Sequence, residues 1–372
     1  ILNQTCLMLS NFNQATRFDE FMRFALYDPQ YGYYARGEQI FGRQGDFITA
    51  PELSPLFGQT LGKALREVLP RCNGVVYEFG AGTGQLACDI LQAAGDLITQ
   101  YNIVDVSAGL KPVQLAKLKA LHGPQVEHKV HWLGELPAEL QGVVLGNEVL
   151  DATPVRRFKW QAGNSQEAWV QHLNGELHWV WKPADPVFAA VVSQLQDAHG
   201  PWPEGYESEI AEQSIAWVKT VTERLNGLAL MIDYGFHEAM YYHPTRRQGT
   251  LRATSRHTAH DDFLVNVGQQ DLTAHVNFSA IYEALTSCGG ELEGYAHQGE
   301  FLLAHGILEL AQKQPEFTHP TRGALMRQNL NTLLNEADMG EAFKVICWSK
   351  GVNAENTQFA QVFLDKDRSG NL

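Results

Sequence analysis

The clearest pattern of apolar and polar positions lies between residues 75 and 91. Residues 75–79 form a short apolar run interrupted by one acid, which is typical of a buried parallel strand. Three glycines follow at alternate positions. From Gln85 onward the apolar residues recur at helical spacing, so that Leu86 and Ile90 share one face. This stretch therefore predicts a strand, a tight turn and a helix.

A strand, a glycine turn and a helix N-terminus together form a corner that binds nucleotides. Dinucleotide folds use the spacing G-x-G-x-x-G. Here the spacing is Gly80-x-Gly82-x-Gly84, and Glu78 precedes it inside the strand. An acid at that point would repel a pyrophosphate, but it suits S-adenosylmethionine, which carries an amino acid and a positive charge. These four residues are predicted to bind that cofactor. The alternative is a glycine turn in another doubly wound enzyme.

The next strand predicts a contact with the ribose of the nucleotide. Residues 101–106 read as a second strand, and Asp105 lies 21 residues beyond Gly84. Nucleotide folds place a ribose-binding acid about 20 residues after the glycine motif. A carboxylate can accept two hydrogen bonds from a vicinal diol, so Asp105 is predicted to bind the ribose.

Further apolar runs at 130–132, 142–146 and 227–232 predict three more strands of the same sheet. Asn147 and Glu148 follow the strand at 142–146, and Asp151 comes three residues later. Ligands of open α/β sheets lie outside the carboxyl ends of the strands. These three polar residues are therefore predicted to face the reaction site.

The N-terminal region supplies a second group of candidate site residues. A polar loop at 45–54 precedes a helix predicted from about residue 55 to 69. Thr49 is interpreted either as a helix cap or as a contact to the cofactor. Asp46 and Glu52 are not explained as caps, so both are predicted to belong to the active site, over which this loop closes.

The remaining pattern predicts an α/β fold with a doubly wound, seven-stranded sheet whose final strand is antiparallel. Residues 1–70 are predicted to form an N-terminal helical and loop segment, and residues 71–372 the sheet domain. That domain carries insertions at about 156–225, with helices at 184–198 and 207–225, and at 237–271, which reads as a polar loop. Alternating residues around Asn174-Gly175 predict a hairpin with a type I′ turn. Its tryptophans, Trp169, Trp179 and Trp181, would either pack on their own sheet or form a homodimer contact.

Composition and charge exclude several classes of protein. The chain has 372 residues and a net charge of −14, which argues against a general nucleic-acid binder. Five scattered cysteines without a C-x-x-C pair predict reduced thiols, and no histidine group has the spacing of a metal site. No apolar run approaches the roughly 20 residues of a membrane span. We see no signal segment, and the start at Ile1 is consistent with missing preceding residues.

Six segments taken together resemble the MidA-type S-adenosylmethionine-dependent methyltransferases. That family comprises the mitochondrial arginine methyltransferase that assists assembly of respiratory complex I, and its bacterial relatives. The segments are 45–54, 78–84, 147–155, 232–235, 249–252 and 271–278. Two departures stand out: Asp105 replaces a more usual Glu, and Asn266-Val267-Gly268 stands where Pro-Gly is usual.

The resemblance implies methyl transfer to an arginine of a protein related to a complex I subunit. A guanidinium remains protonated in water, so carboxylates must hold it and receive its proton. The hypothesis is that Glu148 and Asp151, helped by Asp46 or Glu52, hold the guanidinium. Asn147 would bind the acceptor nitrogen or the amino acid end of the cofactor. The compartment would be the bacterial cytoplasm or the mitochondrial matrix.

Three alternatives stay open from the sequence. The acceptor could be a small molecule or another protein side chain. The chain could be a non-catalytic assembly or binding factor that retains the cofactor fold, although gathered carboxylates argue against that interpretation. A dehydrogenase is disfavoured by Glu78 and by the glycine spacing.

Overall fold

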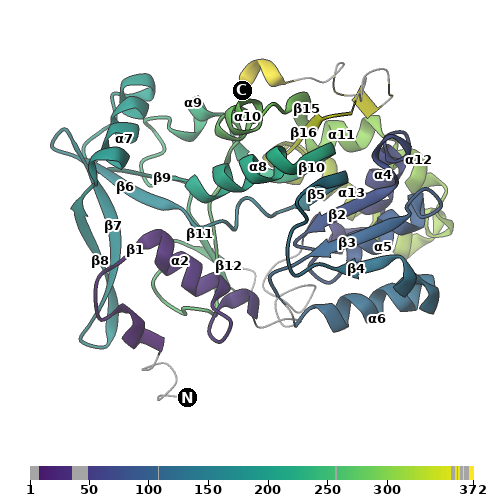
Figure 1. Cartoon of the computed structure of the whole chain (residues 1–372), viewed down its shortest axis with the longest axis horizontal. Helices are drawn as coiled ribbons and strands as arrows, with labels where there is room; N and C mark the ends of the chain where they lie inside the picture. Colours follow the sequence, from purple (N-terminus) through teal and green to yellow (C-terminus); the bar gives the residue numbers. More distant parts are fainter. Residues whose placement is uncertain are drawn as a thin grey trace. The chain divides into compact units, whose positions relative to one another are not determined.

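The computed structural model describes most of the chain, namely residues 8–35, 49–107, 109–255, 258–352, 357, 359–360, 363 and 368–372. The chain divides into two compact units (Figure 1). The first unit comprises residues 1–36, 150–216 and 236–280, and the second comprises residues 37–149, 217–235 and 281–372. Both predicted insertions overlap in sequence with the first unit.

The second unit is built on a mixed sheet with the strand order β15-β16-β10-β5-β2-β3-β4. Its strands are β2 (Val75–Phe79), β3 (Gln100–Val104), β4 (Val130–Trp132), β5 (Leu140–Asn147), β10 (Leu225–Phe236), β15 (Glu291–His297) and β16 (Phe343–Lys350). Strands β4, β3, β2, β5 and β10 are parallel. Strand β16 runs antiparallel to both β10 and β15. The predicted doubly wound sheet with an antiparallel final strand is confirmed. The sheet has eight strands where seven were predicted, because a two-residue strand outside this order also joins it.

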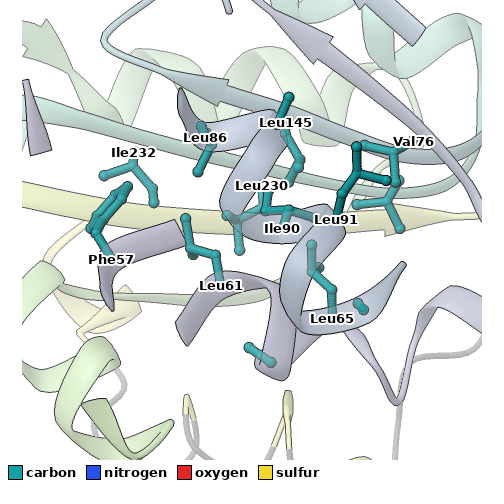
Figure 2. Close-up of a cluster of buried hydrophobic side chains, with 14 of the residues drawn as sticks. Phe57, Leu61, Leu65, Val76, Leu86, Ile90, Leu91, Leu145, Leu230 and Ile232 are labelled. Atoms are coloured by element: carbon teal, nitrogen blue, oxygen red, sulfur yellow. The ribbon is translucent and has the colours of Figure 1, made fainter. Parts of the chain in front are cut away.

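Helices accompany this sheet, and several of them contribute apolar side chains to the core around it. They include α3 (Ala50–Leu53), α4 (Pro55–Leu65), α5 (Gln85–Ala94), α6 (Lys111–His122), α8 (Glu212–Arg224), α10 (Phe278–Ser287), α11 (Gln298–Ala304), α12 (Ile307–Gln312), α13 (Pro320–Leu334) and α14 (Met339–Ala342). Figure 2 shows Leu61 of α4 and Ile90 of α5 beside Leu145 and Leu230 of the sheet. All four are almost fully buried. Burying each such side chain contributes about 1.5–3 kcal/mol, which fixes α5 and the turn before it on the sheet.

The first unit contains a five-stranded antiparallel sheet, in which β7 pairs with β1, β6 and β8, and β6 also pairs with β9. Its strands are β1 (Thr16–Arg17), β6 (Arg156–Gln161), β7 (Asn164–Leu173), β8 (Glu176–Pro183) and β9 (Tyr206–Ile210). The unit also holds a small sheet of β11 (Arg252–Ser255), β12 (Thr258–His260) and β13 (Asp271–Thr273), the strand β14 (Val276–Asn277), and the helices α2 (Phe18–Tyr27), α7 (Pro186–His199) and α9 (Glu238–Tyr241).

The predicted hairpin is confirmed by strands β7 and β8. Asn174 and Gly175 have φ angles of 53° and 90°, as a type I′ turn requires. The hairpin's tryptophans have ring and cation contacts inside the first unit: Trp179 stacks on Trp181, and Lys182 lies over Trp169. These tryptophan rings therefore contact other residues of the same chain.

Two sequence predictions in the first unit were wrong. The predicted helix over 207–225 is a strand, β9, followed by the shorter helix α8, because the start of the segment pairs with β6, with Arg156 opposite Ile210. The predicted loop at 237–271 contains α9, β11, β12 and the start of β13. Strand β11 also pairs with β13, with Arg252 opposite Thr273, and local periodicity does not report such pairing. None of the described helices is long and apolar enough to cross a membrane.

Candidate active site

The turn between β2 and α5 adopts a conformation that favours glycine. Gly80, Gly82 and Gly84 have φ angles of 63°, 51° and 82°. Other residues cost about 1–2 kcal/mol in this left-handed region. A Cβ added to Gly84 would also lie 3.3 Å from Gln114, closer than most such contacts. The alternating glycines predicted from the sequence are therefore required by the backbone.

Gln114 of α6 connects the glycine turn to the end of β3. Its Nε2 donates hydrogen bonds to the carbonyl oxygen of Gly82 at 2.9 Å and to Oδ2 of Asp105 at 3.1 Å. Its Oε1 accepts a 2.6 Å hydrogen bond from Nε1 of Trp132. The side chain is fully buried. Sequence reasoning missed Gln114. Its position one helical turn before the buried Leu118 was the only indication that this polar residue would be buried.

Asp105 follows β3 and is oriented by two hydrogen bonds. The backbone N–H of Ser107 donates to its Oδ1 at 2.9 Å, while Gln114 donates to Oδ2. Burial raises the pKa of Asp105, and both hydrogen bonds oppose that increase. The carboxylate is therefore fixed beside the glycine turn, at the position expected for a ribose contact.

Glu78 is buried in β2, directly before the glycine turn. Burial raises its pKa to about 8, although Tyr101 donates a 2.7 Å hydrogen bond to its Oε2, which lowers the pKa. Asp89 of α5 is also buried, and burial raises its pKa to about 7. The turn thus lies among buried acids whose ionised forms would be stabilised by a nearby positive charge.

Glu52 of α3 is held against the glycine turn. Its Oε1 accepts a hydrogen bond from the hydroxyl of Thr83 and lies 3.3 Å from Nζ of Lys117. Lys117 also donates to Oγ1 of Thr83 at 2.5 Å and to Oε1 of Gln85 at 3.1 Å. Sequence reasoning missed Lys117. The predicted site residue Glu52 therefore contacts both Thr83 and Lys117 beside the turn.

Asn147 and Glu148 lie where β5 ends. Glu148 has a φ angle of 54°, which is uncommon for a residue other than glycine. Its backbone N–H donates to the carbonyl oxygen of Ile232 at 2.9 Å, and its Oε1 accepts a 3.0 Å hydrogen bond from Nδ2 of Asn147. Asn147 pairs in register with Ile232 of β10, so the buried Asp233 follows at the neighbouring strand position. These polar groups occupy the same sheet edge as Gly80 and Asp105.

Asp151 belongs to the first unit and is buried, with 4% of its surface exposed. Its carbonyl oxygen accepts a 2.9 Å hydrogen bond from the backbone N–H of Ala274. In the same unit, the hydroxyl of Tyr34 donates a 3.0 Å hydrogen bond to Oδ1 of the buried Asp271. Burial raises the pKa of Tyr34, and the charges of Asp271 and Asp151 raise it further.

The other predicted site residues come from the N-terminal loop. Thr49 precedes α3 as its N-cap residue, but its side chain makes no capping hydrogen bond. Asp46 lies outside the described residues. Within the ranges that the structure describes, no group of three or more His, Cys, Asp or Glu side chains could hold a metal ion.

Comparison with known proteins decides the family. Residues 57–296 match the model of a family described as "Putative S-adenosyl-L-methionine-dependent methyltransferase". This chain belongs to that family. The matched residues include the glycine turn, Asp105 and the residues after β5, so the methyltransferase match covers the sheet edge described above.

Relatives and a solved structure agree with this assignment. This methyltransferase is 29% identical to the mitochondrial protein arginine methyltransferase NDUFAF7 homologue of Drosophila melanogaster, over 90% of this chain and 82% of that protein. It is 26% identical to human NDUFAF7, over 87% and 78% of the two chains. A Burkholderia thailandensis protein, described as a "likely methyl transferase" and bound to S-adenosylhomocysteine, is 39% identical, with a TM-score of 0.91 over 100% of this chain and 98% of that chain. The methyltransferase activity and the S-adenosylmethionine cofactor predicted from the sequence are thereby confirmed.

Proposed function

We propose that this methyltransferase modifies an arginine side chain of a protein substrate, and that Glu148 holds the guanidinium. The observation that carries the proposal is the left-handed backbone of Glu148 at the carboxyl end of β5. Strained residues of this kind persist where the surrounding structure over-determines them, and they cluster at active sites. The arginine methyltransferase names of the relatives support the choice of acceptor.

The residues around the glycine turn fit the cofactor. Asp105, oriented by Ser107 and Gln114, would accept hydrogen bonds from the ribose hydroxyls. Gly80, Gly82 and Gly84 would admit the amino acid portion close to the backbone, with Glu78, Asn147 and Thr49 as further contacts. When bound, the cofactor supplies a methyl group on a positively charged sulfur.

The acceptor requires a carboxylate because a guanidinium has no free lone pair while it is protonated. In the proposed reaction the carbon–sulfur bond breaks, a carbon–nitrogen bond forms, and the acceptor nitrogen loses one proton. Glu148 would orient the guanidinium through charge-assisted hydrogen bonds and receive that proton at a carboxylate oxygen. Asn147, which donates to Oε1 of Glu148, would keep the carboxylate in one orientation.

We propose that three further acids help to bind the guanidinium, namely Asp151, Glu52 and Asp46. Asp151 follows Glu148 by three residues and is buried in the first unit. Glu52 is paired with Lys117 in the structure, so its participation would require that this ion pair open. A methyl-transfer rate that is unchanged in Glu52→Gln would remove Glu52 from the proposed set.

The experiment compares the wild-type protein with Glu148→Gln in transfer from radiolabelled S-adenosylmethionine to arginine-containing peptides. We expect methylarginine from the wild type and a rate at least about 100-fold lower from the variant, the size typical of lost acid–base catalysis. Affinity for S-adenosylhomocysteine should stay within about threefold. Glu139→Gln, an exposed residue directly before β5, is the matched control. Full activity of Glu148→Gln would contradict the role.

Three further points extend this proposal. The substrate would be a relative of a respiratory complex I subunit, as the family resemblance implies. The compartment would be the bacterial cytoplasm or, for a eukaryotic source, the mitochondrial matrix, as the mitochondrial names of the relatives suggest. A homodimer through the β7–β8 hairpin stays a prediction that the sedimentation coefficient would test.

A further inference from the structure

The first unit contains a cavity of about 880 Å³, a volume within the range of roughly 300–1,000 Å³ that is typical of ligand sites. Its lining residues come from three separate parts of the chain. They are the N-terminal region up to Tyr31, the start of β8, and the loop 262–269 before β13. All of these residues belong to the first unit.

Apolar side chains form much of the wall. They include Tyr31, Leu177, Trp179, Leu264, Val265 and Val267. The ring of Trp179 is fixed by contacts with Phe18 at 5.0 Å and with the guanidinium of Arg157 at 5.2 Å. A wall that is already ordered loses little conformational entropy when a ligand binds.

Apart from Tyr31 and His178, the titratable side chains on the described lining are two acids. Glu176 and Asp262 line the cavity, and among the described residues that line it there is no Lys or Arg. Both acids are exposed, and neither has a salt bridge with a cation in the part of the chain that the structure describes. Apolar walls with two such acids favour a ligand that combines aliphatic and basic side chains.

The same chain segments continue from the cavity to the acids of the first unit. Tyr31 lines the cavity, and Tyr34 lies three residues later. Gln269 lines it too, and Asp271 follows two residues later. Tyr34 and Asp271 are joined by a 3.0 Å hydrogen bond, so the cavity wall and this buried pair are built from adjoining residues.

The loop that forms one wall is held in place by close packing. Gly268 has a φ angle of 72°, and an added Cβ would lie 1.8 Å from the carbonyl oxygen of Tyr31. Asn266 also has a left-handed φ angle, 48°, and its carbonyl oxygen accepts a 2.7 Å hydrogen bond from the backbone N–H of Gln269. The chain therefore forms a defined wall without the Pro-Gly that is usual in similar sequences.

We infer that this cavity binds a segment of the arginine-bearing protein substrate, and that it selects aliphatic and basic residues in that segment. The inference rests on the proposed function for the identity of the ligand as an arginine-bearing chain. Binding through the cavity would contribute to the affinity for the acceptor and leave the affinity for the cofactor unchanged.

The test uses a degenerate library of nine-residue peptides with a central arginine and random residues at the other positions. Wild-type protein saturated with S-adenosylhomocysteine is used to enrich the bound peptides, which are then sequenced. We expect at least threefold enrichment of Lys, Arg, Leu and Ile over Asp and Glu among the random positions. The double variant Glu176→Lys/Asp262→Lys should reverse the charge preference and keep the aliphatic one.

Two controls keep the outcomes distinct. Asp197→Lys reverses an exposed charge on α7 of the same unit, outside the cavity, and should leave the enrichment unchanged. Val265→Asp places a charge on the apolar wall and should remove the aliphatic preference. Enrichment that is absent in the wild type would overturn the inference, and so would enrichment of Lys and Arg that survives the double variant. A change in self-association as the main effect of that variant would also overturn it. Enriched peptides that bind as expected but are never methylated would instead contradict the proposed function.

Discussion

The sheet edge of the second unit that carries the glycine turn and the sheet of the first unit are assembled over different distances along the sequence. In the second unit, β2, the glycine turn, α5 and β3 follow one another, and Asp105 comes directly after β3. In the first unit, Thr16 pairs with Val170, and Arg156 pairs with Ile210. The glycine turn and Asp105 are thus encoded in one short stretch, whereas the sheet of the first unit depends on segments that meet only in the folded chain.

The largest effect that we predict concerns the first unit alone. Gly268→Ala combines a left-handed backbone with a contact of 1.8 Å to the backbone of Tyr31, so it should lower the free energy of unfolding by about 2–5 kcal/mol. Gly163→Ala has the same φ angle of 72° and open space around the Cβ, so it should cost only about 1–2 kcal/mol. Urea unfolding measures both. Equal losses would show that the close approach to Tyr31 does not matter.

A smaller effect is predicted for the second unit. Gln114→Ala removes three hydrogen bonds that join the glycine turn, Asp105 and Trp132. Loss of buried hydrogen bonds costs about 1–3 kcal/mol, so affinity for S-adenosylhomocysteine should fall about 10- to 100-fold in calorimetry. Gln59→Ala, on the surface of α4, is the control and should bind normally. An unchanged affinity in Gln114→Ala would contradict the positioning role.

A third predicted effect is a dependence of the free energy of unfolding on pH. Burial raises the pKa of Glu78 to about 8 and that of Asp89 to about 7. The folded protein therefore keeps protons that the unfolded chain releases at lower pH, and the free energy of unfolding should fall as the pH rises from about 5 to 8. Glu78→Gln can still accept the hydrogen bond from Tyr101 but cannot ionise, so it should flatten this decline. Identical slopes for the two proteins would exclude a raised pKa for Glu78.

Much of the second unit could be predicted because its signals are local. The run 75–79 and the three glycines matched β2 and the positive φ angles of the turn. The partners of these residues could not be predicted. Gln114 and Lys117 are ordinary helix residues in the sequence, and they contact the turn only because α6 packs beside α5.

In the first unit, one local turn could be predicted, but the pairings between distant segments could not. Its hairpin was predicted from Asn174-Gly175, since a type I′ turn has a strong local signature. Strand β9 was mistaken for a helix, and the pairing of Tyr34 with Asp271 had no sequence signal, because 237 positions separate the two residues. Contacts between segments that are far apart in the sequence are therefore harder to predict than a local turn.

The central claim is that the glycine turn of the second unit binds the cofactor and that the cavity of the first unit binds a segment of the protein substrate. Steady-state kinetics of two variants tests this claim most directly. The rates are measured for Gln114→Ala in the second unit and for Glu176→Lys/Asp262→Lys in the first, with S-adenosylmethionine and an enriched peptide each varied in turn. We predict that Gln114→Ala raises the KM for S-adenosylmethionine at least about tenfold, while the double variant raises only the KM for the peptide. A double variant that raised the KM for S-adenosylmethionine as much as that for the peptide would contradict the account.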